Sequence, residues 1–358
     1  GQTQPSLIAS NLVEGKRGQF WSVDIKFDNN ANTRLDSIFL YRGTLTDNKA
    51  NKDSVTWETF KRLPIEPHVM RNPGSSDNNL QYFGSDMDFS PGGKYGWVSI
   101  TADVKEPANP KDFEYDPLFW FTSDSGMTWN GPIHVKLRDF SAIVDTMATV
   151  FTDTAGNPVD TNRIPFSSAS SLTVDGNGNP HLLLKTLLSA ENFNEPDSVY
   201  FIQPAAQKAL WDITTEDFGQ KWGARHVSNL NAHQGQIPNQ GNPLTFDNFP
   251  TASTSRDGNT IFYSWTDDTS LANADFDQMQ PDLHGRAYNI QNNEWTDIKF
   301  WSEDDPNFSG GAFFPQTAAE AMKLDNGDYL NPTVITSPGG GGALDPPVFF
   351  FAQNVTYS

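Results

Sequence analysis

The chain lacks cysteine and is short of basic side chains. Its 358 residues include no Cys, 24 Lys and Arg, and 44 Asp and Glu, which gives a formal net charge of −20. Without thiols there is no disulfide framework, no Cys-ligated zinc or iron–sulfur site and no thiol nucleophile. The acidic excess argues against nucleic acid and anionic membrane surfaces as partners, because phosphate groups demand a basic face.

Long apolar runs are missing as well. No stretch approaches the roughly 18–20 apolar residues of a membrane-spanning helix, and Gly1–Pro5 shows no basic-then-apolar signal pattern. Aromatic residues, by contrast, make up 13 % of the chain, and disordered chains are poor in them. The sequence therefore predicts a folded, acidic, aromatic-rich protein without a membrane span.

The apolar residues come in short runs that favour strands. Each run is rich in aromatic or β-branched residues and is bounded by Gly, Pro, Asn or Asp. The runs are Gly18–Phe27, Ser37–Arg42, Tyr95–Thr101, Leu118–Thr122, His181–Leu184, Ser198–Ile202, Thr260–Trp265, Arg286–Ile290 and Val348–Phe351. One helix is expected over Ala205–Thr214, because it follows Pro204.

A repeated pattern of Pro, a small-residue strand, an Asp/Asn/Gly turn and an apolar strand organises the chain. Asp-Gly and Asn-Gly suit tight hairpin turns that need positive φ. The pattern recurs in Arg163–Leu184, Asn248–Trp265 and Phe313–Leu330, and more loosely in Met87–Val98 and Phe20–Tyr41. In the third copy this alignment predicts a strand over Thr317–Lys323, despite its helix propensity.

The spacing of the turns fits four strands plus loops, and a four-stranded sheet repeated around an axis is a propeller blade. We therefore expect an all-β fold, a β-propeller of five to six four-stranded antiparallel blades, with six favoured. A sixth blade would have to come from around Phe140–Asp153 or from both termini. Residues 1–358 are expected to form one propeller domain, either alone or as the N-terminal part of a longer secreted chain.

One motif resembles a known family. Thr122, Asp124, Gly126, Thr128 and Trp129 fill every position of Ser/Thr-x-Asp-x-Gly-x-Thr-Trp. This motif resembles the Asp-box, or BNR repeat, of sialidase-like propellers. The resemblance implies a structural hairpin turn on the outer strands of a blade, in which Asp accepts backbone N–H groups and Gly takes the left-handed position.

The same resemblance implies candidate catalytic residues if the chain is an enzyme. Sialidases bind the substrate carboxylate with arginines, the first in an Arg-Ile-Pro motif, and use a Tyr–Glu nucleophile pair. The residues of this chain that match are Arg163, Arg225, Arg286 and Tyr288. Because x-(Ile/Phe)-Pro also opens the other repeats, the motif at Arg163 is more simply interpreted as the start of a blade.

Metal ligands and cofactors are not strongly indicated. None of the six His forms a zinc-hydrolase motif. Asp175, Asn177 and Asn179 resemble the start of a calcium loop, but the later Gly and Glu are missing, so a hairpin turn is the favoured interpretation. No cofactor is expected, and calcium is left open.

Five Asp-(Ser/Thr)-x triplets exceed the one or two expected by chance. They resemble the O-glycosylation signal of secreted Bacteroidetes surface proteins. The candidate hydroxyls are those of Ser37, Ser54, Thr146, Thr154 and Ser198. The excess favours an extracellular or cell-surface glycoprotein.

Together these features predict a secreted or cell-surface propeller without catalytic activity, which binds glycan or protein through loops at its axial face. Exposed Trp and Tyr on loops suit such ligands. One alternative is a sialidase-like glycoside hydrolase, which would need three Arg or a pair of carboxylates to converge at the axis. A second is a structural surface-layer or adhesin module.

Overall fold

The fold is nearly all-β, as the sequence predicted. The computed structural model of the chain describes residues 13–14, 19–28, 33–46, 54–70, 80, 82–104, 115–146, 151–152, 158–159, 163–191, 199–201, 208–232, 234–237, 244–268, 277–278, 280–302, 309, 311–337, 348–352 and 355–357. Within this part the helices are η2 (Leu137–Asp139) and α1 (Ser141–Thr146), and α1 lies in the stretch Phe140–Asp153 that was considered for a sixth blade. No helix formed by the described residues is long and apolar enough to cross a membrane.

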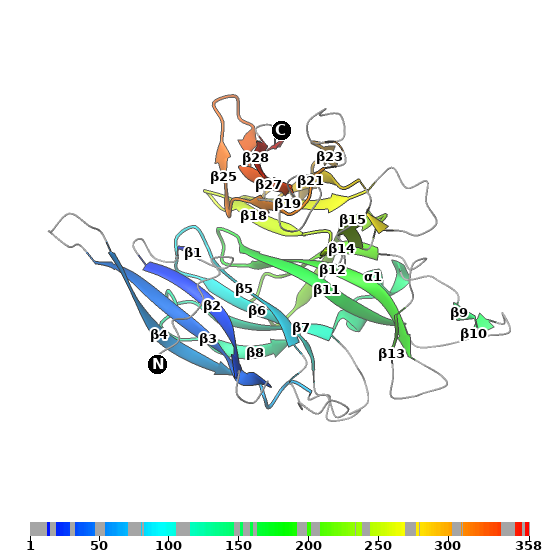
Figure 1. The fold of residues 1–358 in the computed structure, drawn as a ribbon. Helices are drawn as coiled ribbons and strands as arrows, with labels where there is room; N and C mark the ends of the chain where they lie inside the picture. The colour runs from blue at the N-terminus through cyan, green and yellow to red at the C-terminus, as the bar shows by residue number, and fades with distance from the viewer. Residues whose placement is uncertain are drawn as a thin grey trace. The chain divides into compact units, whose positions relative to one another are not determined.

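The contacts divide the chain into two compact units. Unit 1 comprises Gly1–Pro110 and Tyr115–Val135, and unit 2 comprises Lys111–Glu114 and Lys136–Ser358. Most neighbouring strands in both units pair antiparallel, and in unit 2 two pairs, β18 with β25 and β16 with β20, are parallel (Figure 1). The single propeller domain over residues 1–358 stays a prediction.

Unit 1 holds two four-stranded antiparallel sheets, with strand orders β1-β2-β3-β4 and β5-β6-β7-β8. The strands are β1 (Val13–Glu14), β2 (Gln19–Asp28), β3 (Thr33–Thr46), β4 (Ser54–Pro64), β5 (Tyr82–Phe89), β6 (Gly96–Asp103), β7 (Tyr115–Thr122) and β8 (Asn130–His134). Each sheet is therefore a complete four-stranded meander, which is the predicted repeating unit.

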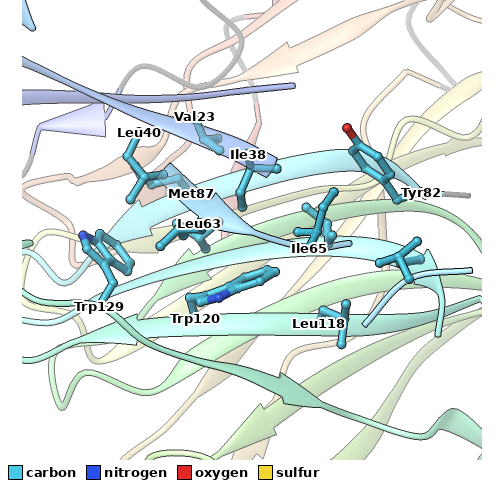
Figure 2. Close-up of a cluster of buried hydrophobic side chains, with 14 of the residues drawn as sticks. Val23, Ile38, Leu40, Leu63, Ile65, Tyr82, Met87, Leu118, Trp120 and Trp129 are labelled. Carbon is cyan, nitrogen blue, oxygen red and sulfur yellow. The ribbon is translucent and has the colours of Figure 1, made fainter. Parts of the chain in front are cut away.

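Apolar side chains from both sheets form the core of unit 1 (Figure 2). Trp21 on β2 is fully buried, and its ring lies 5.1 Å from Phe60, 5.6 Å from Phe89 and 6.3 Å from Trp129, measured between centroids. Burying aromatic rings in such pairs stabilises the fold beyond the area that each removes from water. Trp21, Trp120 and Trp129 are thus part of the core that the two sheets of unit 1 share.

Unit 2 contains three larger sheets and two small ones. The first is ordered β11-β12-β14-β15 with β13 beside β12, the second β22-β21-β19-β18-β25-β26-β29 with β23 beside β21, and the third β24-β27-β28. The strands of the first sheet are β11 (Arg163–Val174), β12 (Pro180–Glu191), β13 (Val199–Phe201), β14 (Lys208–Thr215) and β15 (Trp222–Leu230).

The remaining strands of unit 2 are shorter. Those of the second and third sheets are β18 (Thr251–Ser255), β19 (Thr260–Asp267), β21 (Asp282–Asn289), β22 (Glu294–Trp295), β23 (Lys299–Phe300), β24 (Pro315–Thr317), β25 (Glu320–Lys323), β26 (Tyr329–Leu330), β27 (Thr333–Ser337), β28 (Val348–Ala352) and β29 (Thr356–Tyr357). The small sheets contain β9 (Phe151–Thr152), β10 (Pro158–Val159), β16 (Gln234–Ile237), β17 (Leu244–Phe246) and β20 (Asp277–Gln278).

The first strands of the unit 2 meanders lie side by side. The N–H of Ala252 on β18 donates to Ser171 Oγ on β11 over 3.0 Å. On its other side β18 pairs in parallel with β25, where Thr254 lies opposite Glu320. The first and second sheets of unit 2 therefore meet along β11 and β18, and β18 also joins the two halves of the second sheet.

Two of the repeated Asp-Gly-Asn turns touch through their backbones. Gly176 N donates to Gly258 O over 3.0 Å, and a Cβ on Gly258 would lie 2.2 Å from Gly176 N. Gly258 also has a φ of 71°, a conformation that glycine adopts without steric cost. At this position glycine is needed both for the turn and for the contact between neighbouring hairpins.

Each of the five copies of the repeated pattern was predicted to form a hairpin. All five contain an antiparallel pair of strands in the structure, two in unit 1 and three in unit 2. The strand over Thr317–Lys323 is confirmed as the end of β24 together with β25. The helix predicted over Ala205–Thr214 is wrong, because Lys208–Thr215 is strand β14. Every residue of β14 is buried between β12 and β15, and burial of this kind overrides local propensity.

Candidate functional site

Two phenylalanines with strained backbone conformations lie in unit 2, just before strands β18 and β24. Phe249 and Phe314 have φ angles of 43° and 45°, and each directly precedes a Pro. Their half-buried rings meet edge to face with centroids 5.2 Å apart. Left-handed backbone costs a bulky residue energy, and such strain concentrates at functional sites. This aromatic pair is therefore the first element of a candidate site.

A positioned carboxylate stands two residues before Phe249. Asp247 Oδ1 forms an ion pair with Lys185 Nζ from β12 and accepts the N–H of Asn248 over 2.7 Å. The Asp247 side chain is 35 % exposed, whereas that of Lys185 is fully buried. Burial lowers the pKa of Lys185, although the Asp247 carboxylate opposes that shift. One carboxylate oxygen is thus held from inside the protein while part of the group remains open to solvent.

The segment that carries Asp247 is fixed by hydrogen bonds to its neighbours. The buried Asn248 side chain donates through Nδ2 to Thr266 O over 2.8 Å and to Ala232 O over 3.3 Å. Asp267, at the end of β19, accepts the N–H groups of Asn231, Ala232 and Asp268. Burial raises the pKa of Asp267 to about 6 despite these N–H donors. We assign Asn248 and Asp267 to the support of the site, since both are buried and hydrogen-bonded to the backbone.

We name Lys185, Asp247, Phe249 and Phe314 the strand-start site. Sequence analysis did not identify it. Its members lie on separate segments, with Lys185 62 residues before Asp247. The x-Phe-Pro pattern of two repeats was the one available signal, and it was interpreted only as the start of a blade.

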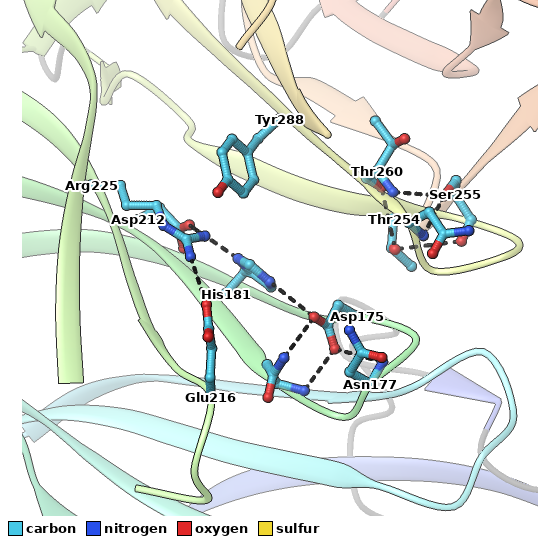
Figure 3. Close-up of polar contacts among 12 residues, drawn as sticks. Asp175, Asn177, His181, Asp212, Glu216, Arg225, Thr254, Ser255, Thr260 and Tyr288 are labelled. Atoms are coloured by element: carbon cyan, nitrogen blue, oxygen red, sulfur yellow. Dashed lines mark hydrogen bonds and ion pairs between the residues drawn. The ribbon is translucent and has the colours of Figure 1, made fainter. Parts of the chain in front are cut away.

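A second polar cluster lies in unit 2 between the first two sheets (Figure 3). His181 on β12 stands between two carboxylates, with Nδ1 3.0 Å from Asp212 Oδ2 and Nε2 3.7 Å from Asp175 Oδ2. Burial by itself lowers the pKa of His181, but the Asp212 and Asp175 carboxylates outweigh it and raise the pKa to about 9. The cluster is therefore a buried ionic network at neutral pH.

Two of the residues implied by the sialidase resemblance belong to this network. The Arg225 guanidinium lies 4.5 Å from the centroid of the Tyr288 ring. Its Nη1 is 3.6 Å from Asp212 Oδ2, and its Nη2 is 3.3 Å from Glu216 Oε1. The structure thus brings Arg225 and Tyr288 together, with the arginine already engaged by two carboxylates of the protein.

The other two arginines of that set do not join a common pocket among the described side chains. Arg286 donates from Nη1 to Val227 O over 3.1 Å and from Nη2 to Thr296 O over 2.9 Å. Its guanidinium also lies 4.5 Å from the Trp295 ring centroid. Arg163 begins β11, and the position of its side chain lies outside the described part of the structure. A catalytic role for these residues stays a prediction.

The turn that resembles an Asp-box is held by its own side chains. Asp124 Oδ1 accepts the N–H of Thr128 over 2.8 Å, and the buried Thr122 Oγ1 accepts the N–H of Gly126 over 3.0 Å. Thr122 in turn donates its hydroxyl to Asp124. A Cβ on Gly126 would lie 2.5 Å from the Trp21 ring, so the turn also packs on the core.

Sequence analysis missed a second turn of this type, between β14 and β15. Thr215 Oγ1 accepts the N–H of Gly219 over 3.1 Å, and Asp217 Oδ1 accepts that of Lys221 over 2.8 Å. Phe218, like Ser125 in the first turn, has a positive φ of 56°. The pattern Thr-x-Asp-x-Gly followed by Trp222 was visible in the sequence and lacked only the second Thr.

The calcium candidates form a turn. Asp175 Oδ1 accepts the N–H groups of Asn177 over 2.9 Å and of Asn179 over 2.7 Å, and Asn179 Nδ2 donates to Asp175 Oδ2. These hydrogen bonds close the hairpin turn that the sequence favoured at these residues. Among the residues that the structure describes, no group of three or more His, Asp or Glu side chains is arranged to hold a metal ion.

The five proposed O-glycosylation residues occupy different surroundings. Ser37 is buried, and its hydroxyl accepts a hydrogen bond from Arg62 Nε over 2.7 Å. Thr146 is half-buried and donates to Ile143 O. Ser54 begins β4, but its side chain is not described, and Thr154 and Ser198 lie outside the described residues.

Comparison with known proteins gives distant likenesses of structure only. No protein-family model matches the chain, and no curated protein matches it in sequence. A protein of unknown function from Dyadobacter fermentans aligns with 96 % of this chain and 82 % of its own, at 9 % identity and a TM-score of 0.39.

Two solved enzymes align to a similar extent. The Hadza microbial sialidase Hz136 aligns with 97 % of this chain and 59 % of its own, at 10 % identity and a TM-score of 0.38. The α-L-arabinanase of Penicillium chrysogenum, solved with arabinobiose, covers 96 % and 78 %, at 12 % identity and a TM-score of 0.38. Likenesses of this size assign neither an activity nor a site residue to this chain.

Proposed function

We propose that this protein is a secreted or cell-surface β-propeller that binds a glycan without cleaving it, and that it does so at the strand-start site. The observation that carries the proposal is the Phe249–Phe314 pair together with the carboxylate two residues before Phe249, which a buried lysine holds. Aromatic rings offer apolar faces to sugar rings, and a carboxylate accepts hydrogen bonds from hydroxyl groups. A non-catalytic role is favoured because the four residues of the strand-start site include one partly exposed carboxylate, whereas glycosidases use a pair.

The arrangement of strands supports the propeller part of the proposal. Successive four-stranded meanders in each unit and adjacent first strands in unit 2 are the elements from which blades are built. On this proposal the sheets are blades of one ring of five or six. The strand-start site then lies where the first strands open toward the axis, the place at which the loops were expected to bind.

The test is binding to a glycan array by the wild-type protein and by Phe249→Ala and Phe314→Ala. Loss of one stacking ring is worth about 1.4 kcal/mol, so each variant should bind about tenfold more weakly. Phe249→Tyr keeps an aromatic ring and should bind like the wild type. Phe349→Ala is the matched control, because Phe349 is 67 % exposed but lies on β28, outside the site.

Equal losses in Phe349→Ala and Phe249→Ala would refute the proposal, because binding would then follow general surface hydrophobicity. Thermal melts of each variant show that the fold is intact. If the ligand is a protein, no glycan on the array will bind, but the chain will still capture a cell-surface protein. That result would also count against the proposal.

A sialidase-like glycoside hydrolase is the second candidate, because Arg225 and Tyr288 lie together with Glu216 close by. A panel of fluorogenic glycosides separates it from the first. Turnover that is abolished by Tyr288→Phe but retained in Phe249→Ala would establish the enzyme and its location. Turnover unaffected by Tyr288→Phe would exclude this cluster as the catalytic centre.

A further inference from the structure

The charge of the strand-start site narrows the class of glycan that it accepts. We infer that its ligand is a neutral glycan, and that glycans carrying a carboxylate, such as sialic acid or uronic acid, are excluded. The inference rests on the proposed function and deepens it. It also differs from the expectation raised by the sialidase resemblance, in which arginines hold an anionic sugar.

The first observation is the placement of the two charges. The Asp247 side chain is 35 % exposed, but Lys185, its ion-pair partner, is 0 % exposed and is therefore shielded from any ligand in solvent. Lys185 Nζ and the N–H of Asn248 both contact Oδ1 of Asp247. Of the two charges, only the negative one of Asp247 is therefore open to solvent, two residues before Phe249 in the chain.

The second observation concerns the cations that an acidic sugar would need. Recognition of a carboxylate is best served by the planar guanidinium of arginine. Arg286 donates to two main-chain carbonyls and Arg225 forms ion pairs with two carboxylates, so both guanidinium groups already make contacts within the protein. Both also lie on or beside the interface of the first two sheets, where they stack on Trp295 and Tyr288.

The third observation is the surrounding field. Asp267 adds a further carboxylate beside Lys185, close enough to influence its pKa, and the whole chain carries a net charge of −20. A field of this sign repels anions before contact and is screened by salt. Stacking on Phe249 and Phe314 and hydrogen bonding of hydroxyls to Asp247 need no charge on the sugar.

The experiment compares one oligosaccharide in two forms, neutral lacto-N-neotetraose and the same tetrasaccharide capped with sialic acid. A second pair, xylotetraose and its glucuronic acid-substituted form, varies the backbone. Affinities are measured by glycan array and by calorimetry at 50 mM and 500 mM NaCl. We expect the acidic member of any bound pair to bind at least tenfold more weakly at low salt, with the ratio falling at high salt.

Asp247→Asn tests the origin of the discrimination. It preserves shape and an acceptor oxygen but removes the exposed negative charge, so the acidic-to-neutral affinity ratio should rise toward one. If this variant fails to fold because the buried Lys185 loses the negative charge of Asp247, the double variant Lys185→Met/Asp247→Asn removes both charges and should show the same rise. Asp217→Asn is the matched control, because Asp217 lies in the β14–β15 turn and its loss should leave the ratio unchanged.

The outcomes separate this inference from the proposed function. Binding that is lost in Phe249→Ala, with equal or tighter affinity for the acidic glycans, would overturn the inference and leave the proposed function standing. Discrimination that persists unchanged in Asp247→Asn would also overturn it. No binding by any glycan, or binding that is insensitive to Phe249→Ala and Phe314→Ala, would instead refute the proposed function.

Discussion

The contact between the Asp175-Gly176 and Asp257-Gly258 turns makes a sharp prediction for Gly258→Ala. The new Cβ would lie 2.2 Å from Gly176 N and 2.3 Å from Gly176 Cα, both backbone atoms that cannot rotate away. The left-handed φ of 71° adds about 1–2 kcal/mol for a residue with a side chain. Forcing the two hairpins apart adds about 1–3 kcal/mol, by analogy with overpacking of a core.

We therefore expect Gly258→Ala to lower the free energy of unfolding by about 2–5 kcal/mol, the sum of these two terms. Gly327→Ala is the matched control, because Gly327 has a φ of 94° in another repeat turn but no heavy atom within 4 Å of the new Cβ. It should cost only the conformational part, about 1–2 kcal/mol.

The assay is urea denaturation of the full chain, followed by tryptophan fluorescence and circular dichroism, with the midpoint and slope compared between variants. Coincidence of the two probes checks that a single free energy describes the transition. Equal destabilisation by Gly258→Ala and Gly327→Ala would refute the reasoning, because the contact between hairpins would then contribute nothing beyond the turn itself.

Other predictions concern the buried polar groups. Asp212→Asn should destabilise the protein by about 3–5 kcal/mol, because it removes the buried carboxylate that His181 and Arg225 share. Glu216→Gln, at an exposed partner, should cost less than about 1 kcal/mol, and similar urea midpoints of the two variants would contradict this reasoning. Because the pKa of His181 is raised from 6.5 to about 9, its contribution should be complete below pH 6.5 and lost as pH rises through 9, and Asp212→Asn should flatten that part of a stability–pH curve. Thr122→Val and Thr215→Val should each cost about 1–3 kcal/mol in urea melts, since each leaves a glycine N–H of its turn without an acceptor.

Turns and strands were the part of the structure most accessible from the sequence. Asp-Gly-Asn at residues 175–177 and 257–259 predicts tight hairpins because the requirement for positive φ is local to a few residues. The strand over Thr317–Lys323 followed from its place in the repeat, against its own propensity. The missed turn at Thr215–Trp222 shows that a motif short of one residue still forms the same hydrogen bonds.

Burial on both faces could not be deduced in the same way. The stretch ending at Thr214 was predicted as a helix, yet Lys208–Thr215 is a strand with all eight residues buried. Lys208, Asp212 and Thr214 share one side of this strand and are buried as well, so that side could not be recognised as buried from its residue types. Its neighbours β12 and β15, which lie on either side in the sheet, decide its conformation.

The sequence by itself determined the class of the fold and the repeated hairpin. It also excluded disulfides and thiol chemistry, because the chain has no cysteine. These follow from composition and from interactions within a few residues. Only the tertiary structure decided which charges are neutralised and which face solvent. Lys185 and Asp247 lie far apart along the chain and become a pair through the packing of β12 against the segment before β18. The aromatic pair of Phe249 and Phe314 arises in the same way, because β18 lies beside β24 and β25.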